Sequence, residues 1–388
     1  MPRATQPHMP RRFLFLACAL AAAACSNTEL REEPESVLTN ELGLHDVSIL
    51  FPLPAKGELG SWLGADSTGR HGVLLPEWLA SELPVGEARA DLRVVAMRID
   101  PCFPSLVGAP KASCRFQLRL TLQPLTETNG EVAAGELALH LFYDLPVSDF
   151  IALTGELGTA RPEAIAGPLD VHPTLAAEGL AGSYAASVRA ALLDAAGESR
   201  LRRVTFSTAG ASGHSMSFGG VDLVSGKAAP IAIAGTGVSE QSFVVEPSSD
   251  PDGLSAQVVP KLSGALDDMG PLYDRGAASK LDEAALWSLY ETTLRVENPS
   301  LRSSANVDCV SCHTAGSARL WLEQGHAFAS RPSGLRFASQ FDLALTHPPE
   351  DALSLRAFGY SGRLPVISAR TVNESAAVAL YLNQRLVR

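Results

Sequence analysis

The stretch RFQLRLTLQPL, residues 115–125, carries the clearest structural signal in this chain of 388 residues. Apolar and polar residues alternate along it, which is the period-two pattern of a β-strand with one buried face and one wet face. The apolar set is Phe116, Leu118, Leu120 and Leu122, and the polar set is Gln117, Arg119, Thr121 and Gln123. Residues 115–125 are therefore expected to form a strand of a half-covered sheet.

The flanking sequence extends this pattern. Further strands are predicted at 46–53, 92–99, 135–145, 202–208, 230–235 and 241–247. Helices are predicted at 147–157 and at about 174–196. Mostly antiparallel strands with a few helices predict an α+β domain over residues 45–265. No catalytic motif was found in it, so its role is not predicted.

The C-terminal part follows a helical pattern. Apolar residues recur at near-helical spacing over 280–295, and a capping box of Thr371 and Glu374 predicts the start of a terminal helix. We expect a linker at 266–280 followed by a small, mainly helical domain at 281–388. The predicted fold class is thus α+β, with a β-rich first domain and a helical second one.

The N-terminus has the marks of a secretory signal. Arginines come first, an apolar run of twelve residues at 13–24 follows, and that run is too short to span a bilayer. Residues 1–24 are therefore expected to be removed on export. Residues 25–44 are polar and acidic, which is typical of a flexible tether.

Cys25 follows small residues at the expected cleavage point. This arrangement resembles a bacterial lipobox, and the resemblance implies that Cys25 carries a lipid anchor. Ala22 departs from the family's usual leucine, Cys18 is a competing site, and an ordinary cleaved signal remains an alternative. Ser26 after Cys25 resembles lipoproteins sent to the outer membrane, so we expect the periplasmic side of a bacterial membrane as the location.

Composition limits the possible partners. The chain is 46% hydrophobic, enough for real cores, and its net charge is −11. A chain this acidic is a poor candidate for binding nucleic acid. Residues 301–388 differ from the rest, because they carry nine arginines, no lysine and six acids. Arginine pairs well with carboxylates, including the propionates of a haem.

Export makes the six cysteines informative. Cys102 and Cys114 flank a short loop between two strand-like runs, and an oxidising compartment favours their pairing as a disulfide. Such a bridge stabilises a domain by ~3 kcal/mol on the loop-entropy estimate. Cys309 and Cys312 then belong to a separate motif.

The stretch VDCVSCHTAG, residues 307–316, contains that motif. Cys309, Cys312 and His313 match the C-x-x-C-H pattern of covalent haem attachment, in which two thiols add to the vinyl groups of one macrocycle. A redox dithiol, a zinc site and a plain disulfide are the alternatives. The first needs a preceding strand, the second needs another ligand pair, and the third is strained over two residues.

From about residue 278 the chain resembles the c-type cytochromes. The resemblance implies one covalent haem c on Cys309 and Cys312, with His313 as the proximal iron ligand. One feature departs from the family: no methionine lies downstream of the motif to serve as the usual distal ligand. His347 and His326 are the downstream candidates, with His347 preferred because it lies on a loop well beyond the motif. A five-coordinate iron remains open.

The resulting functional expectation is an exported, membrane-anchored monohaem cytochrome that carries single electrons to and from a redox partner protein, which the sequence does not identify. Two alternatives stay open. One is a peroxidase-like haem enzyme with an open iron position. The other is a surface lipoprotein that binds a partner through residues 45–265 and uses the haem as a structural or sensory group.

Overall fold

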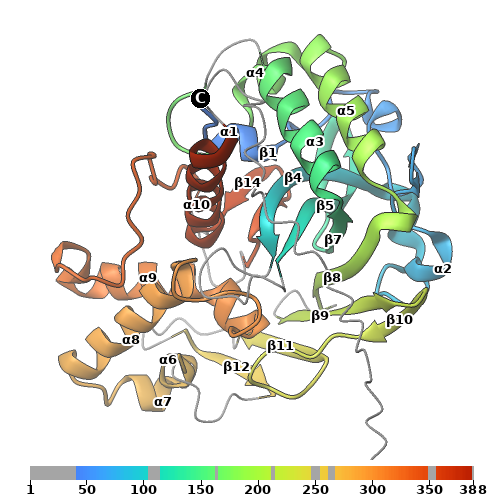
Figure 1. Ribbon diagram of the computed structural model, residues 1–388. Coiled ribbons are helices and arrows are strands. Elements are labelled where there is room, and N and C mark those ends of the chain that lie inside the picture. The colour runs from blue at the N-terminus through green and yellow to red at the C-terminus, as the bar shows by residue number, and fades with distance from the viewer. Residues whose placement is uncertain are drawn as a thin grey trace, which may run out of the picture.

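The computed structural model describes residues 41–103, 114–161, 165–210, 215–245, 254–260, 267–347 and 355–386. The predicted signal at 1–24 and the predicted lipidation at Cys25 lie outside these residues. The described part is a mixed α+β structure built on a large antiparallel sheet, with helices gathered toward the C-terminus, as Figure 1 shows. The expected fold class is therefore confirmed.

The sheet has ten strands in the order β1-β4-β5-β7-β8-β9-β11-β12, with β6 paired to β5 and β10 paired to β9. Its strands are β1 (Ser48–Leu50), β4 (Leu92–Phe103), β5 (Arg115–Thr128), β6 (Glu131–Ala134), β7 (Ala138–Leu145), β8 (Leu201–Ala209), β9 (Ser215–Val224), β10 (Lys227–Pro230), β11 (Glu240–Val245) and β12 (Ala256–Val259). Two small hairpins form sheets of their own, namely β2 (Thr68–Gly69) with β3 (Gly72–Val73), and β13 (Phe358–Ser361) with β14 (Leu364–Ile367).

The helices are α1 (Leu44–Val47), α2 (Glu77–Ala80), α3 (Val147–Ala160), α4 (Pro173–Glu178), α5 (Ser183–Ala195), α6 (Gly270–Tyr273), α7 (Arg275–Ala278), α8 (Glu283–Glu297), α9 (Cys309–Gly325) and α10 (Ala369–Leu386). Short 3₁₀ helices lie at Leu59–Ser61, Gly86–Asp91, Glu198–Arg200 and Ala327–Ser330. None of the described helices is both long and apolar enough to cross a membrane.

The alternation along 115–125 gives the sheet one apolar face and one polar face, as expected. Leu118, Leu120 and Leu122 of β5 are fully buried, and they share a core with α3 and α5, which cover that face (Figure 1). The opposite face carries polar residues, including Arg119 and Thr121. Arg119 pairs in register with Arg98 on β4, and Thr121 pairs with His140 on β7.

Several sequence-based boundaries were wrong, among them the strand predicted at 46–53, which is the end of α1 followed by the short β1. The helix predicted over 174–196 is two helices, because Gly179, with φ +75, turns the chain between α4 and α5. The strand predicted at 230–235 ends at Pro230. The terminal helix begins at Ala369, so Thr371 lies inside it. Ser368 accepts the Thr371 N–H through its hydroxyl, and Glu374 forms ion pairs instead of closing a capping box.

The C-terminal elements share their cores with the sheet. Met216 and Phe218 of β9 pack in one core with α8 and α9. Val372 and Ala376 of α10 pack in another with Val95 of β4. The predicted division into 45–265, a linker at 266–280 and 281–388 therefore does not coincide with a boundary between hydrophobic cores.

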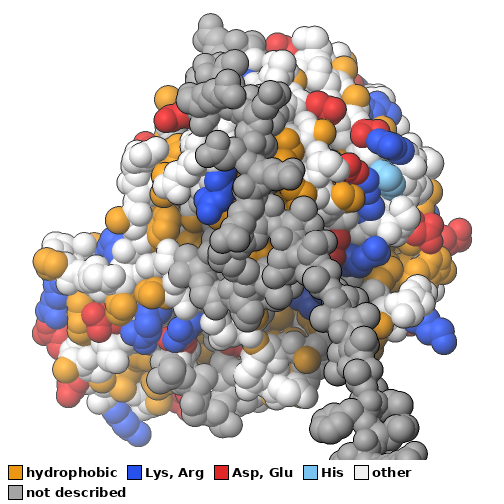
Figure 2. All heavy atoms as spheres, viewed as in Figure 1, with side chains coloured by type: hydrophobic (Ala, Val, Ile, Leu, Met, Phe, Trp, Pro, Cys, Tyr) orange, Lys and Arg blue, Asp and Glu red, His pale blue; other side chains and the backbone are white. Residues whose placement is uncertain are grey.

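Cys102 and Cys114 form a disulfide between the end of β4 and the start of β5, with their Cα atoms 4.5 Å apart. This is the pairing that the sequence predicted. On the face of the molecule in Figure 2, basic and acidic side chains are interspersed over the part that can be seen. That part shows no broad patch of a single sign.

Candidate functional site

The C-x-x-C-H motif forms the first turns of α9. Cys309, Cys312 and His313 stand at positions i, i+3 and i+4 of this helix, so they lie on one face of it. Asp308 caps the helix by accepting the Ser311 N–H at 3.0 Å. The Val310 N–H donates to Gln241 Oε1 at 3.0 Å, which fixes the start of α9 over β11. Local helix geometry thus gathers the three motif side chains.

The two cysteines are free thiols in this structure, and each keeps part of its surface accessible. Burial, with the negative charges of Cys312 and Asp308, raises the pKa of Cys309 to about 12. Burial likewise raises the pKa of Cys312 to about 11. A redox dithiol at a helix start works through a lowered pKa. These two groups remain thiols at neutral pH, which does not favour that alternative.

His313 is oriented by the main chain. Its Nδ1 lies 2.5 Å from the carbonyl oxygen of Leu355. A carbonyl only accepts, so Nδ1 carries the proton and Nε2 keeps its lone pair. Its ring packs against Phe218 at a centroid distance of 4.7 Å. Burial lowers the pKa of His313, so the imidazole is neutral. Metal-bound histidines are typically held in this way, with the second ring nitrogen bonded to a carbonyl or carboxylate.

Arginines surround the motif face. The charge of Arg203 on β8 acts on Cys309, and the charge of Arg370 on α10 is the strongest that acts on Cys312. Arg356 follows the Leu355 carbonyl directly and donates to Ser207 Oγ at 3.4 Å and to Glu136 Oε2 at 2.7 Å. This placement agrees with the arginine excess of the C-terminal segment.

A buried ion network lies beside Cys312. Glu374 accepts from Arg370 at 2.6 Å and from Arg98 at 2.8 Å, and Arg119 pairs with Asp100. Burial alone would raise the pKa of Glu374, but the charges of Arg370 and Arg98 hold it well below its usual range. Within the described residues, the buried Nε atoms of Arg98, Arg119 and Arg356 have no hydrogen-bond partner. Arg98, Arg119 and Arg370 share two carboxylates, Glu374 and Asp100, so this network can accommodate further negative charge.

The structure places His326 far from His313 along α9 and gives His347 a carboxylate partner. His326 ends α9, thirteen residues after His313, so the two are ~20 Å apart along the helix axis. Histidine nitrogens ligate metals at ~2 Å, so one iron cannot reach both in this arrangement. His347 Nε2 is bonded to Asp170 Oδ1 at 2.8 Å, and its main-chain oxygen accepts from Ile367. In the described residues no three His, Cys, Asp or Glu side chains converge as a metal site.

His140 is a further histidine near the motif, for which no partner is evident in the sequence. It lies on β7, on the polar face of the sheet, and its Nδ1 is 3.2 Å from Thr121 Oγ1. Burial lowers its pKa to about 3, and the charge that a protonated His313 would carry is the next cause. His140 therefore lies near His313, although 172 residues separate them. A lone histidine on a strand offered no signal of this.

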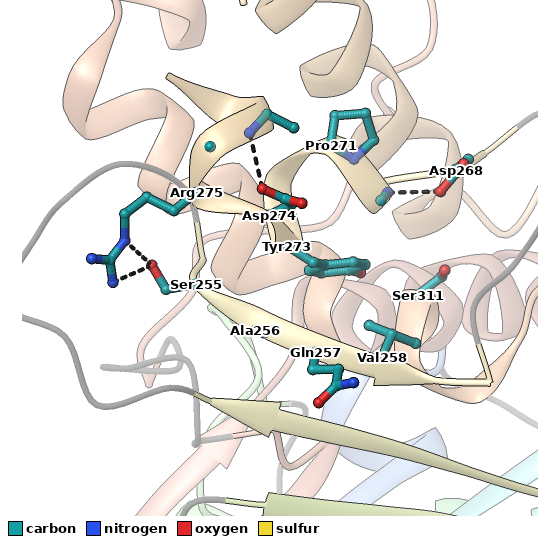
Figure 3. A pocket seen from close by; sticks show the side chains of 13 residues that line it. Ser255, Ala256, Gln257, Val258, Asp268, Pro271, Tyr273, Asp274, Arg275 and Ser311 are labelled. Atoms are coloured by element: carbon teal, nitrogen blue, oxygen red, sulfur yellow. Dashed lines mark hydrogen bonds between the residues drawn. The ribbon is translucent and has the colours of Figure 1, made fainter. Parts of the chain in front are cut away.

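A pocket of about 620 Å³ lies behind the motif (Figure 3). Ser311, Tyr273, Asp268, Asp274 and Arg275 are among the residues that line it. Ser311 is two residues from both Cys309 and His313, so on a helix it points away from their face. The pocket is thus on the opposite side of α9 from the motif side chains.

Comparison with known proteins adds no identification. No protein-family model, no curated protein and no solved structure matches this chain.

Proposed function

We propose that this protein is an exported, membrane-anchored monohaem c-type cytochrome that carries single electrons. The observation that carries the proposal is the arrangement of one helix face. Cys309 and Cys312 present free thiols beside His313, and the Leu355 carbonyl leaves His313 Nε2 available as a ligand. Thiols, a neutral imidazole and this spacing are what covalent haem attachment requires.

The surrounding residues fit the group. Cys309 and Cys312 would hold haem c by thioether bonds, and His313 would ligate its iron. When bound, the haem supplies one-electron chemistry at the iron. Around Arg98 and Arg370 the arginines outnumber their carboxylate partners, so a local positive charge remains. This charge would suit the two propionates of the haem. This chain contributes the attachment, the ligand orientation and the charge balance.

The N-terminal segment supplies the setting for this chemistry. Haem attachment of this kind takes place on the exported side of the membrane, which the predicted signal at 1–24 provides. A lipid on Cys25 and the tether at 25–44 would hold the protein at the periplasmic side of a membrane, with the outer membrane favoured. The electron would pass to and from a redox partner protein at that surface.

The proposal is tested by expressing the full chain with cytochrome c maturation machinery. We expect a pyridine haemochrome spectrum of thioether-linked haem and an intact mass that includes one haem. Cys309→Ser and Cys312→Ser should each remove one thioether link and shift that spectrum. Ser311→Ala is the matched control, because Ser311 lies on the opposite side of the helix and should leave haem content unchanged. Colourless exported protein without the added mass would refute the proposal.

A further inference from the structure

We propose that His140, on the central strand β7, is the second axial ligand of the iron whose first ligand is His313. This inference rests on the proposed function, because it concerns the same haem. It gives the large sheet a role, since one side of the haem site would then come from the N-terminal part of the chain. It also favours an electron carrier over an enzyme with an open iron position.

The sheet register places His140 next to the residues under His313. On one face of the sheet, Phe218 of β9 is opposite Ser207 of β8, which is opposite Ala138 of β7. His140 is two residues along from Ala138 and therefore points to the same face. With strands about 4.8 Å apart and a rise of about 3.3 Å per residue, the Cα atoms of His140 and Phe218 are ~12 Å apart.

The contacts of His313 place it over this same region. Its ring packs on Phe218, and its Nδ1–H donates to Leu355. The next residue, Arg356, reaches down to Ser207 of β8. His313 is thus attached to the sheet at Phe218 and, through the Leu355–Arg356 pair, at Ser207. Both anchor points are on the face from which His140 projects.

The state of His140 suits a ligand. Its Nδ1 is engaged by Thr121, and in the described part of the chain no hydrogen bond to Nε2 is found. The side chain is set deep in the molecule, yet part of its surface is accessible. His313 and Cys312 are likewise half-buried.

The residues paired with His140 across the sheet have small side chains. Its neighbours on the same face are Thr121 and Thr205, and Thr205 is opposite Gly220 of β9. These side chains are small or absent, so His140 has the longest side chain among the residues paired across β5, β7, β8 and β9 at this position.

The test is ligand replacement in the haem-loaded full-length protein. The unmodified ferric protein should show a low-spin, six-coordinate optical and electron paramagnetic resonance spectrum. His140→Ala should lose that spectrum and become high-spin, and the ferrous form should bind carbon monoxide readily. Added imidazole should restore the low-spin spectrum, because it can occupy the space that the missing ring leaves. His347→Ala and His326→Ala are matched controls and should remain low-spin.

A second variant guards against loss of folding in His140→Ala. His140→Met keeps a long side chain with a ligand atom, and we expect its midpoint potential to rise, since methionine ligation favours the reduced iron. A low-spin spectrum unchanged in both His140 variants would overturn the inference, as would its loss in His347→Ala alone. A high-spin spectrum of the unmodified protein would also overturn it. In each of these outcomes haem is still attached, whereas protein without covalent haem would contradict the proposed function itself.

Discussion

His313 and His172 use the same ring atom in opposite ways. The Nδ1–H of His313 donates to the Leu355 carbonyl, which leaves Nε2 as an acceptor. The Nδ1 of His172 instead accepts the Leu175 N–H at 3.4 Å, so its Nε2 carries the proton toward Tyr184 Oη at 3.2 Å. One hydrogen bond therefore makes His313 fit for metal ligation and makes His172 a structural helix cap.

His172 makes stability depend on pH. Burial lowers its pKa from 6.5 to about 3, so the unfolded state binds the proton more readily between these values. Its contribution to stability is therefore complete above about pH 6.5 and falls as the pH drops toward 3, by up to ~1.4 kcal/mol per pH unit. His172→Asn keeps a capping acceptor without titrating. Urea unfolding between about pH 7 and pH 5 should show a shallower loss of stability in this variant. If the free energy of unfolding fell equally steeply with pH in both proteins, this role of His172 would be contradicted.

Thr121 positions His140 in the proposed haem site. Thr121→Val removes the hydroxyl that holds Nδ1 while keeping the shape of the side chain. Loss of such an outer partner typically weakens a ligand by about tenfold or more. We expect haem-loaded T121V to remain low-spin but to bind carbon monoxide about tenfold more tightly in its ferrous form. The control is Thr205→Val, which changes the residue opposite His140 on the neighbouring strand β8. Unchanged carbon monoxide affinity in T121V would show that the hydroxyl does not position the ligand.

The shared face of the C-x-x-C-H residues was predictable from sequence because its geometry is local. Cys309, Cys312 and His313 lie within two turns of one helix, so spacing alone places them on a common face. His140 was not predictable, because it reaches this site through strand order and register, which a single sequence does not encode visibly. The downstream histidines looked better placed along the chain, yet His326 is at the far end of α9 and His347 is bonded to Asp170.

At the scale of elements, prediction worked where one pattern dominated. The alternation at 115–125 lies within β5, and the helical spacing at 280–295 largely matches α8. It failed where a backbone constraint interrupted a good pattern, as Gly179 does between α4 and α5. It also failed at the start of α10, where Glu374 resembled a capping residue but is drawn into ion pairs by Arg98 and Arg370.

Glu374 joins α10 to the sheet. Arg98 on β4 and Arg370 on α10 are only 11% and 10% exposed, and both pair with this carboxylate. Glu374→Gln leaves the two guanidinium groups without its charge, and we expect a loss of ~3 kcal/mol or more in the free energy of unfolding. Glu131→Gln breaks the Arg363–Glu131 pair, which is 59% and 62% exposed, and should cost less than ~1 kcal/mol. Urea denaturation of both variants measures the difference. Equal costs would show that the buried network does not stabilise α10.

At the scale of the whole molecule, the C-terminal segment packs against the N-terminal part of the chain. Leu382 and Leu386 of α10 pack into the core that α3 and α5 cover. Gln123 of β5 accepts the Tyr360 N–H at 2.7 Å, from the hairpin that precedes α10. The helical segment around the motif rests on Phe218 and Phe243 of the sheet. The C-terminal third therefore completes cores that begin in the N-terminal two thirds.

This sharing predicts that the C-terminal segment does not fold alone. A fragment of residues 267–386 keeps Cys309, Cys312 and His313 but loses the sheet that covers α9 and α10. It exposes the apolar face of α10, including Val378 and Leu382, which are now buried. We expect this exported fragment to lack a cooperative thermal transition by circular dichroism, whereas residues 25–388 should show one. Any haem that the fragment does attach should be high-spin, because His140 is absent. A fragment with cooperative unfolding and a low-spin spectrum would show instead that residues 281–388 are a self-sufficient domain with their own distal ligand.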